Sequence, residues 1–155
     1  MPESIPNEDK LSRACFELPP GVDAASGFLF KYRDAIGDRP ESVYWRKYAV
    51  SDADVHRRGC ELERLRQSRA APGKSPGPYV GFRTAKAGAV RAVAEAGYEL
   101  QVIHSPENGD DAHAHICVRK DNLPVTNSIP RSVLRVLIHL LFAKFAEFKS
   151  HSCPQ

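Results

Sequence analysis

The sequence predicts a single α+β domain, built on a mixed, mostly antiparallel sheet of about five strands with three helices. The length, the hydrophobic pattern and the order of the segments all support this class. The chain has 155 residues, which suits one domain large enough to bury its own core. Strand and helix patterns follow the order ββα, βα, ββ, α, which favours an α+β arrangement. We expect the domain to cover 13–150, with a flexible tail over 1–12 and a short tail over 151–155.

Five segments carry strand patterns. FLFKYRD alternates in part between aromatic and basic residues, and SVYWRKY is aromatic and β-branched. YELQVIH and AHAHICVRK also alternate, while YVGF is short. The sequence therefore predicts strands over 28–34, 42–48, 79–82, 98–104 and 112–120.

The first predicted helix begins after Ser51, which forms a capping-box pattern with Asp54, and runs to about Arg69. Few of its residues are apolar, so much of it should face water. The segment that follows, APGKSPGP (71–78), holds three prolines and two glycines and predicts a mobile loop.

Two further helices are expected. Alanine dominates the segment 84–97, where Thr84 suits the N-cap and Gly97 suits a left-handed C-terminal position. The apolar segment 133–148 predicts a strongly buried final helix. Ser128, as a cap, and Pro130, in the first turn, indicate the start of this helix.

Composition narrows the class of protein. Hydrophobic residues make up 42% and charged residues 26%, which is ordinary for a globular protein, and the net charge of +3 does not demand a nucleic-acid partner. Segment 133–148 is shorter than the ~20 apolar residues of a membrane span and contains charges. The first residues lack a secretory signal, so we expect a cytoplasmic protein. The cysteines form no C-x-x-C pair, so we expect reduced thiols at Cys15, Cys60, Cys117 and Cys153.

The segment DDAHAHICV (110–118) is the main candidate for a functional site. Side chains alternate along a strand, so one face of this segment is apolar and should lie on the core. That apolar face consists of Ala112, Ala114, Ile116 and Val118. The opposite face carries His113, His115 and Cys117, followed by Arg119.

Three interpretations of this histidine face are open. Imidazole and thiolate are good zinc ligands, so His113, His115 and Cys117 could hold a metal. A histidine could instead act as an acid, a base or a hydrogen-bond donor. The face could also be simply the polar side of a sheet. His104, on the neighbouring strand, should lie on the core side, whereas Glu99 and Gln101 should face the histidines.

The loop before this strand is acidic. Glu107, Asp110 and Asp111 lie close in sequence to His104 and His113. They could orient an imidazole or bind a cation, or they could form a solvated turn. Their spacing differs from that of a calcium-binding loop.

A basic stretch runs from 57 to 91, with nine Lys or Arg residues against Glu61 and Glu63. Such a surface could track phosphates, or it could be a solvated face or a docking face for an acidic protein. The basic residues are Arg57, Arg58, Arg64, Arg66, Arg69, Lys74, Arg83, Lys86 and Arg91.

Signatures of enzymes and cofactors are absent. The chain contains no G-x-S-x-G, P-loop or G-x-G-x-x-G motif, so no cofactor is predicted. An enzymatic alternative would use His113 or His115 as acid or base on a nucleotide or another phosphate-bearing substrate. Arg33 or Arg46 would then hold the anion, provided that they lie on the same side of the sheet.

Three short motifs, S-V-Y (42–44), S-P (105–106) and A-H-A-H-I (112–116), resemble a signature of small bacterial proteins that are mostly described as hypothetical. The resemblance covers roughly residues 28–120. The chain has Asp110-Asp111 where that signature has Asn-Pro. The resemblance implies a bacterial cytoplasmic protein, and it emphasises His113 over His115 without implying a reaction.

Taken together, these features favour a non-enzymatic accessory or binding protein with a protein partner, as in a bacterial stress or phage-defence operon. The working surfaces would be the basic helix and the His113 end of the hairpin. The alternatives are a small enzyme that uses His113 and a nucleic-acid-binding module that uses 57–91. No oligomeric state is predicted.

Overall fold

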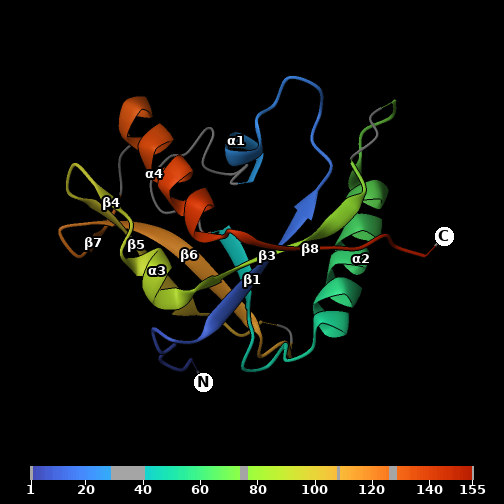
Figure 1. Cartoon of the computed structure of the whole chain (residues 1–155), viewed down its shortest axis with the longest axis horizontal. Coiled ribbons are helices and arrows are strands. Elements are labelled where there is room, and N and C mark those ends of the chain that lie inside the picture. Colours follow the sequence, from blue (N-terminus) through green and yellow to red (C-terminus); the bar gives the residue numbers. More distant parts are fainter. Residues whose placement is uncertain (1, 29–40, 74–76, 108, 126–128, 155) are drawn as a thin grey trace.

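The computed structural model describes residues 2–28, 41–73, 77–107, 109–125 and 129–154, arranged around one sheet (Figure 1). The strand order is β4-β5-β6-β2-β1-β3-β8, and β7 pairs with β6. The strands are β1 (Lys10–Phe16), β2 (Glu41–Trp45), β3 (Tyr79–Lys86), β4 (Ala94–Glu95), β5 (Tyr98–His104), β6 (His113–Lys120), β7 (Leu123–Pro124) and β8 (Glu147–Ser150). The helices are α1 (Ala24–Phe28), α2 (Asp52–Arg69), α3 (Ala87–Arg91) and α4 (Arg131–Lys144).

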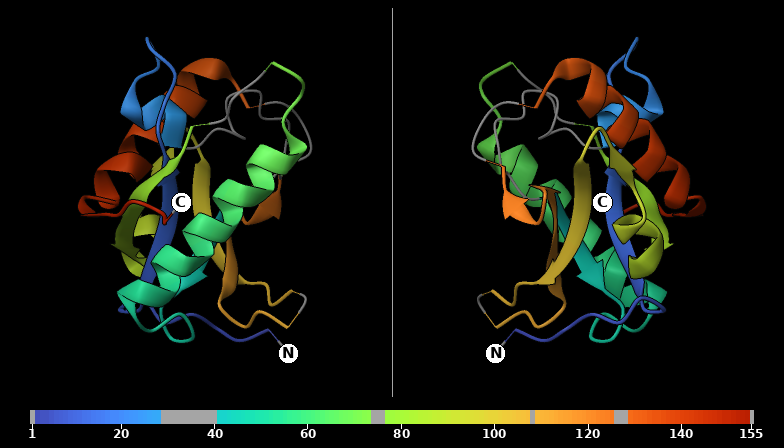
Figure 2. Two further views of the ribbon diagram at one scale, coloured as in Figure 1. Left: turned by 90° about the vertical axis from the view of Figure 1, so that its right-hand side faces the viewer. Right: turned by 90° about the vertical axis from the view of Figure 1, so that its left-hand side faces the viewer.

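The two long helices cover opposite faces of the sheet. Figure 2 shows α2 on one side and α4, together with α1, on the other. Helix α2 connects β2 to β3, which both pair antiparallel with β1 and therefore run parallel to each other. Helix α4 leads to the edge strand β8. No helix in the described ranges is long and apolar enough to cross a membrane.

The face under α4 holds the larger apolar core. Helix α4 buries one stripe of its surface, consisting of Leu134, Leu137, Ile138 and Leu141. From the sheet, the same core receives Leu11, Val43, Trp45, Leu100, Val102, Ala114 and Ile116. The spacing of the helix residues and the alternation of the strand residues are those expected for two elements packed face to face.

The face under α2 has a smaller core, formed by Ala49, Val55, Phe82 and Ala112 with Tyr44 packed against it. Gly59 allows α2 to lie directly on Tyr79, because a Cβ at this position would come within 2.2 Å of a ring carbon of that residue. Most other residues of α2 are polar, as the sequence predicted, so they face solvent or form ion pairs.

The predicted α+β class is confirmed, and the sheet has more strands than the five expected. Every strand pair in the described residues is antiparallel. The first helix has the predicted limits, since the Ser51 side chain accepts a hydrogen bond from the Asp54 backbone N–H and the helix ends at Arg69. The strand predicted over 98–104 is confirmed as β5, and that over 112–120 is confirmed as β6 from His113 onward.

The helix predicted over 84–97 is wrong. Strand β3 continues to Lys86, where the Thr84 hydroxyl hydrogen-bonds to Ser12 instead of capping a helix. Only the single turn α3 is helical. Gly97 does have a positive φ of 83°, but it follows Ala96 with φ 52° in the turn between β4 and β5, which is typical of a tight hairpin. Among the alanines of this segment, Ala85 and Ala87 are buried, whereas Ala92, Ala94 and Ala96 are exposed.

The final helix is shorter than predicted. It ends at Lys144, and the segment that was expected to complete it becomes the edge strand β8. Phe145 supplies the reason, because its side chain is fully buried and its backbone leaves the helical conformation at the C-cap. Ser128, the expected cap, lies outside the described residues.

Neither expected tail is free of the domain. Ile5 is buried, and β1 begins at Lys10 and lies in the interior of the sheet, so the tail predicted over 1–12 is wrong. At the other end, Cys153 is joined to Cys60 in a disulfide, which contradicts the expectation of reduced thiols at these two positions. The two cysteines are 93 positions apart, so no local sequence pattern indicated this pairing.

Three other predicted segments fall partly outside the described residues or differ in length. The strand expected over 28–34 begins where α1 ends, and 29–34 are not described. The strand expected over 42–48 is β2, which ends at Trp45. In the loop 71–78, residues 74–76 are not described, whereas Pro78 accepts a backbone hydrogen bond from Glu17.

Candidate metal centre

The two histidines of β6 have the predicted geometry, whereas Ala112, which was expected on the same core face as Ala114, packs in the smaller core under α2. Ala114, Ile116 and Val118 are buried in the core, so His113 and His115 project together from the opposite face. Their side chains are 15% and 22% exposed, and the ring centroids lie 4.7 Å apart. Solvent therefore reaches both rings, although each is partly enclosed.

Strand β2 forms one border of this face. In the β2–β6 pairing, Tyr44 lies opposite His113 and Ser42 lies opposite His115. Two of the short motifs, 42–44 and 112–116, thus lie side by side in adjacent strands, although Ser42 and His113 are 71 positions apart in the sequence. The S-V-Y motif was the sequence signal at Ser42, and it did not by itself place this residue beside His113.

The turn between β5 and β6 brings a carboxylate to the two rings. Glu107 and Asp110 exchange backbone hydrogen bonds across the turn, and Gly109 has a φ of 78°, which suits a tight hairpin. Oε1 of Glu107 lies 3.9 Å from Nδ1 of His113 and 3.9 Å from Nε2 of His115. One ligand atom from each of these three residues lies within 4.8 Å of the other two.

Hydrogen bonds fix the tautomer of the neutral His113 ring. Its Nδ1 lies 2.9 Å from the Ser105 carbonyl oxygen, which can only accept, so Nδ1 carries the proton. Nε2 then has the lone pair and accepts a hydrogen bond from the Ser42 hydroxyl over 3.3 Å. An imidazole N–H donated to a backbone carbonyl is the usual outer contact of a metal-bound histidine, because it orients the ring and leaves the other nitrogen available.

Cys117 and His104 do not join this cluster. Cys117 is buried, and its thiol donates to the Gln101 carbonyl at 3.9 Å. His104 is also buried, on the core side as predicted, where it accepts from the Glu3 backbone N–H and donates to the Asp111 carbonyl. Facing His115 on β5 is Ile103, whereas Gln101 lies opposite Cys117, so β5 adds no carboxylate beside the rings.

Of the three loop acids, only Glu107 belongs to the cluster. Asp110 accepts from Arg58 of α2 over 2.5 Å and from the Ala112 backbone N–H over 3.0 Å, so it holds the turn in place. The Arg58 guanidinium also lies over the Tyr44 ring. Burial raises the pKa of Tyr44 to about 12, so its phenol stays neutral at physiological pH.

Of the two arginines proposed for anion binding, only Arg46 lies in the described residues, and its guanidinium is engaged by other groups. Arg46 lies on the α2 side of the sheet, but its guanidinium donates to the Ala49 and Val50 carbonyls, to Ser12 and to Asp52. It therefore fastens the connection between β2 and α2. Arg33 lies outside the described residues.

The basic stretch does not form one surface. Arg83 lies on the α4 side, over the rings of Phe142 and Phe148, and Arg91 donates to the carbonyls of Ile5 and Val102. On α2, Arg57 pairs with Asp54 and Glu61. Arg58 and Arg66 rest on aromatic rings, while Arg64, Arg69 and Lys86 are exposed; Lys74 is not described. The fold thus divides these cations between different sides of the sheet.

Comparisons of the chain with family models, with curated proteins and with solved structures found no match.

Proposed function

We propose that this chain is a metal-binding protein, and that Glu107, His113 and His115 hold one divalent transition-metal ion of the zinc type. The observation that carries this proposal is the convergence of two imidazoles and a carboxylate, each with a ligand atom within 4.8 Å of the others. Two histidines at positions i and i+2 of a strand project from the same face, so β6 provides a rigid base for them.

The ligand chemistry favours zinc or a similar metal over magnesium or calcium. Imidazole nitrogen and carboxylate oxygen bind zinc at about 2.0–2.2 Å, whereas magnesium and calcium prefer oxygen ligands alone. Ligand atoms around a tetrahedral ion of this size lie about 3.4 Å apart. The 3.9 Å separation between Oε1 of Glu107 and Nε2 of His115 would contract by about half an ångström, which the half-exposed side chain of Glu107 allows.

Three protein ligands leave a coordination position open to solvent or to a partner. This arrangement fits the expected binding or accessory role, in which a partner protein or a small ligand completes the metal site. A bacterial cytoplasmic setting remains part of the proposal and rests on the sequence resemblance, and a role in a stress or defence operon belongs to the accessory-protein hypothesis of the sequence analysis.

A second candidate function is acid–base chemistry at His113. The hydrogen bond between Ser42 and Nε2 of His113 supports it, because a hydroxyl next to an oriented imidazole is the arrangement of an activated nucleophile. The two functions make opposite demands on Ser42. Metal binding through Nε2 displaces its hydroxyl, so Ser42→Ala should preserve metal affinity, whereas a serine nucleophile could not be replaced.

Calorimetric titration of chelator-treated protein with Zn²⁺ tests the main proposal. We expect one ion per chain, and an affinity about a hundredfold lower or worse in His113→Ala, His115→Ala and Glu107→Gln. His139→Ala is the matched control, since this exposed histidine lies on α4. Absence of zinc binding, or binding that both histidine variants retain, would contradict the proposal.

A further inference from the structure

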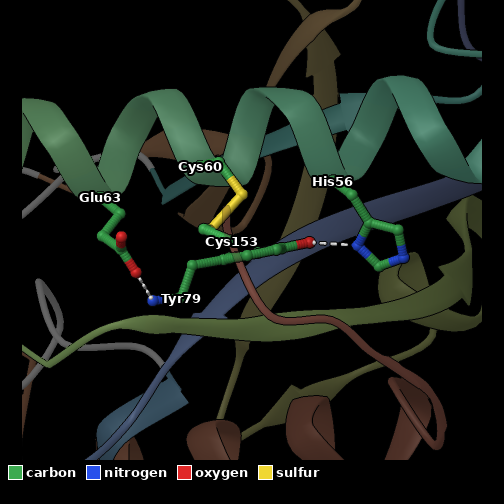
Figure 3. The surroundings of a disulfide bond; sticks show 5 residues. All are labelled: His56, Cys60, Glu63, Tyr79 and Cys153. Carbon is green, nitrogen blue, oxygen red and sulfur yellow. Dashed lines mark hydrogen bonds between the residues drawn. A yellow bond between two sulfur atoms is a disulfide. The ribbon is translucent and has the colours of Figure 1, made fainter. Parts of the chain in front are cut away.

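The last described residues of the chain form a strap that crosses the edge of the sheet toward α2. Strand β8 pairs with β3, and the His151 backbone N–H then donates to the Val80 carbonyl over 3.0 Å. Beyond this point Cys153 is bonded to Cys60 in the middle of α2 (Figure 3). We call residues 147–153 the C-terminal strap.

The contacts of this strap, other than the disulfide, are peripheral. All four residues of β8 are exposed. Lys149 forms an ion pair with Asp52 at 2.6 Å, but both side chains are more than 40% exposed, and such pairs add little stability. The His151 ring stacks on His56 with centroids 4.2 Å apart. A short, exposed edge strand held in this way is prone to local opening.

The disulfide adds a second covalent attachment to the strap. One end continues from α4, and the other is bonded to α2. Without the bond, the described residues of the strap would be held by their continuation from α4, by the β8–β3 pairing and by the peripheral contacts given above.

The strap covers two features of the domain. It occupies the outer edge of β3, where the Lys149 carbonyl approaches so closely that a Cβ at Gly81 would lie 2.2 Å from it. It also forms one wall of a groove of about 560 Å³ beside α2. Its lining includes Cys60, Tyr79 and Val80 together with His151 and Cys153 of the strap.

We propose that the Cys60–Cys153 disulfide is a reversible latch, and that its reduction by a small thiol such as glutathione releases the C-terminal strap. Cys60 is buried and Cys153 is half-buried, so an attacking thiolate reaches the sulfur of Cys153 more readily. The attack forms a mixed disulfide at Cys153 and expels the Cys60 thiolate, which takes up a proton. A second thiol then displaces Cys153 as a thiol, so two small thiols are oxidised to one small disulfide.

Release of the strap opens the outer edge of β3 and one side of the groove. An edge strand with unpaired backbone groups is the surface to which another extended segment can add. In a reducing cytoplasm most thiols remain reduced, and protein disulfides there are mainly transient or redox-sensing, which is the behaviour assigned here to this bond.

Hydrogen exchange at equilibrium with glutathione buffers tests the latch on the full chain. Alkylation and mass spectrometry first measure the fraction of Cys60 and Cys153 in the disulfide. We expect at least tenfold faster exchange in 147–151 and along the outer edge of β3 on reduction, with unchanged exchange in the β5–β6 hairpin. Cys153→Ser should show the same pattern without a reductant, whereas Cys15→Ser should behave like the unaltered protein.

Three outcomes would overturn the latch. In one, the disulfide fails to form at any glutathione ratio. In another, the strap is equally protected in both redox states. In the third, reduction speeds exchange throughout the domain, so that the bond is a general stabilising cross-link. None of these outcomes involves the metal site, so this proposal and the proposed function can fail separately.

Discussion

On one face of the sheet α4 packs through a continuous apolar stripe, whereas on the other α2 is held largely by polar and covalent contacts. Helix α4 buries Leu134, Leu137, Ile138 and Leu141. The contacts of α2 include the Arg58–Asp110 ion pair, a hydrogen bond from the Tyr79 backbone N–H to Glu63, a hydrogen bond between His56 and the Tyr79 hydroxyl, and the Cys60–Cys153 disulfide.

The difference in packing between α4 and α2 explains on which face of the sheet a ligand-binding site can form. An apolar helix must cover the face on which it packs, so the α4 side leaves its core residues inaccessible. Helix α2 makes specific contacts at a few points, and the histidines of β6 remain partly open beside it. The α4 face therefore provides most of the stability, while the α2 face carries the polar groups that can bind a ligand.

The largest effect on stability should come from the α4 core. We predict that Leu141→Ala lowers the free energy of unfolding by about 3–4 kcal/mol, because it leaves a cavity in place of a fully buried side chain. Leu140→Ala is the matched control on the same helix, where the side chain is 40% exposed and the loss should stay below about 1 kcal/mol. Urea denaturation measures both values. Similar losses in the two variants would show that α4 does not stabilise the domain through this one stripe.

On the α2 side, Gly59→Ala should cost about 2 kcal/mol. The new Cβ would meet the buried Tyr79 ring, and overpacking of this kind outweighs the gain in helix propensity. Ser68→Ala, on the exposed end of the same helix, should change stability by less than about 0.5 kcal/mol. Thermal unfolding followed by circular dichroism compares them. A stabilising effect of Gly59→Ala would mean that α2 is not pressed against Tyr79.

The smallest effect concerns pH. Burial, followed by the nearby His151, lowers the pKa of His56, with Lys149 and Arg46 acting in the same direction and Asp52 opposing them. The unfolded chain therefore binds a proton more readily, so this contribution to stability is present above the unfolded value near 6.5 and is lost as the pH falls toward the folded pKa. We expect a smaller loss of stability between pH 7 and pH 5 in His56→Gln. Urea denaturation at the two pH values measures this loss, and an equal loss in His56→Gln and in the unaltered protein would contradict this assignment.

Local sequence patterns predicted several features of the two faces. The alternation of β6 separated His113 and His115 from the core and correctly excluded His104. The Ser51 cap located α2. These features depend on neighbouring residues, which a sequence displays directly.

What the sequence did not display depends on contacts between distant segments. The disulfide joins residues 93 positions apart, and Ser42 approaches His113 only through the β2–β6 pairing. The alanine-rich segment 84–97 has good helix formers, but tertiary packing holds its first residues in β3. Glu107 was one of three loop acids, and only the geometry of the turn distinguishes it from Asp110, which binds Arg58.

The position of bound zinc tests the central claim most directly. Crystals grown with Zn²⁺ and measured at the zinc absorption edge should show one anomalous peak per chain, between Glu107, His113 and His115. The peak should persist in Ser42→Ala and disappear in the double variant His113→Ala/His115→Ala. A peak at the stacked His56–His151 pair instead, or no peak on the histidine face of β6, would contradict the account.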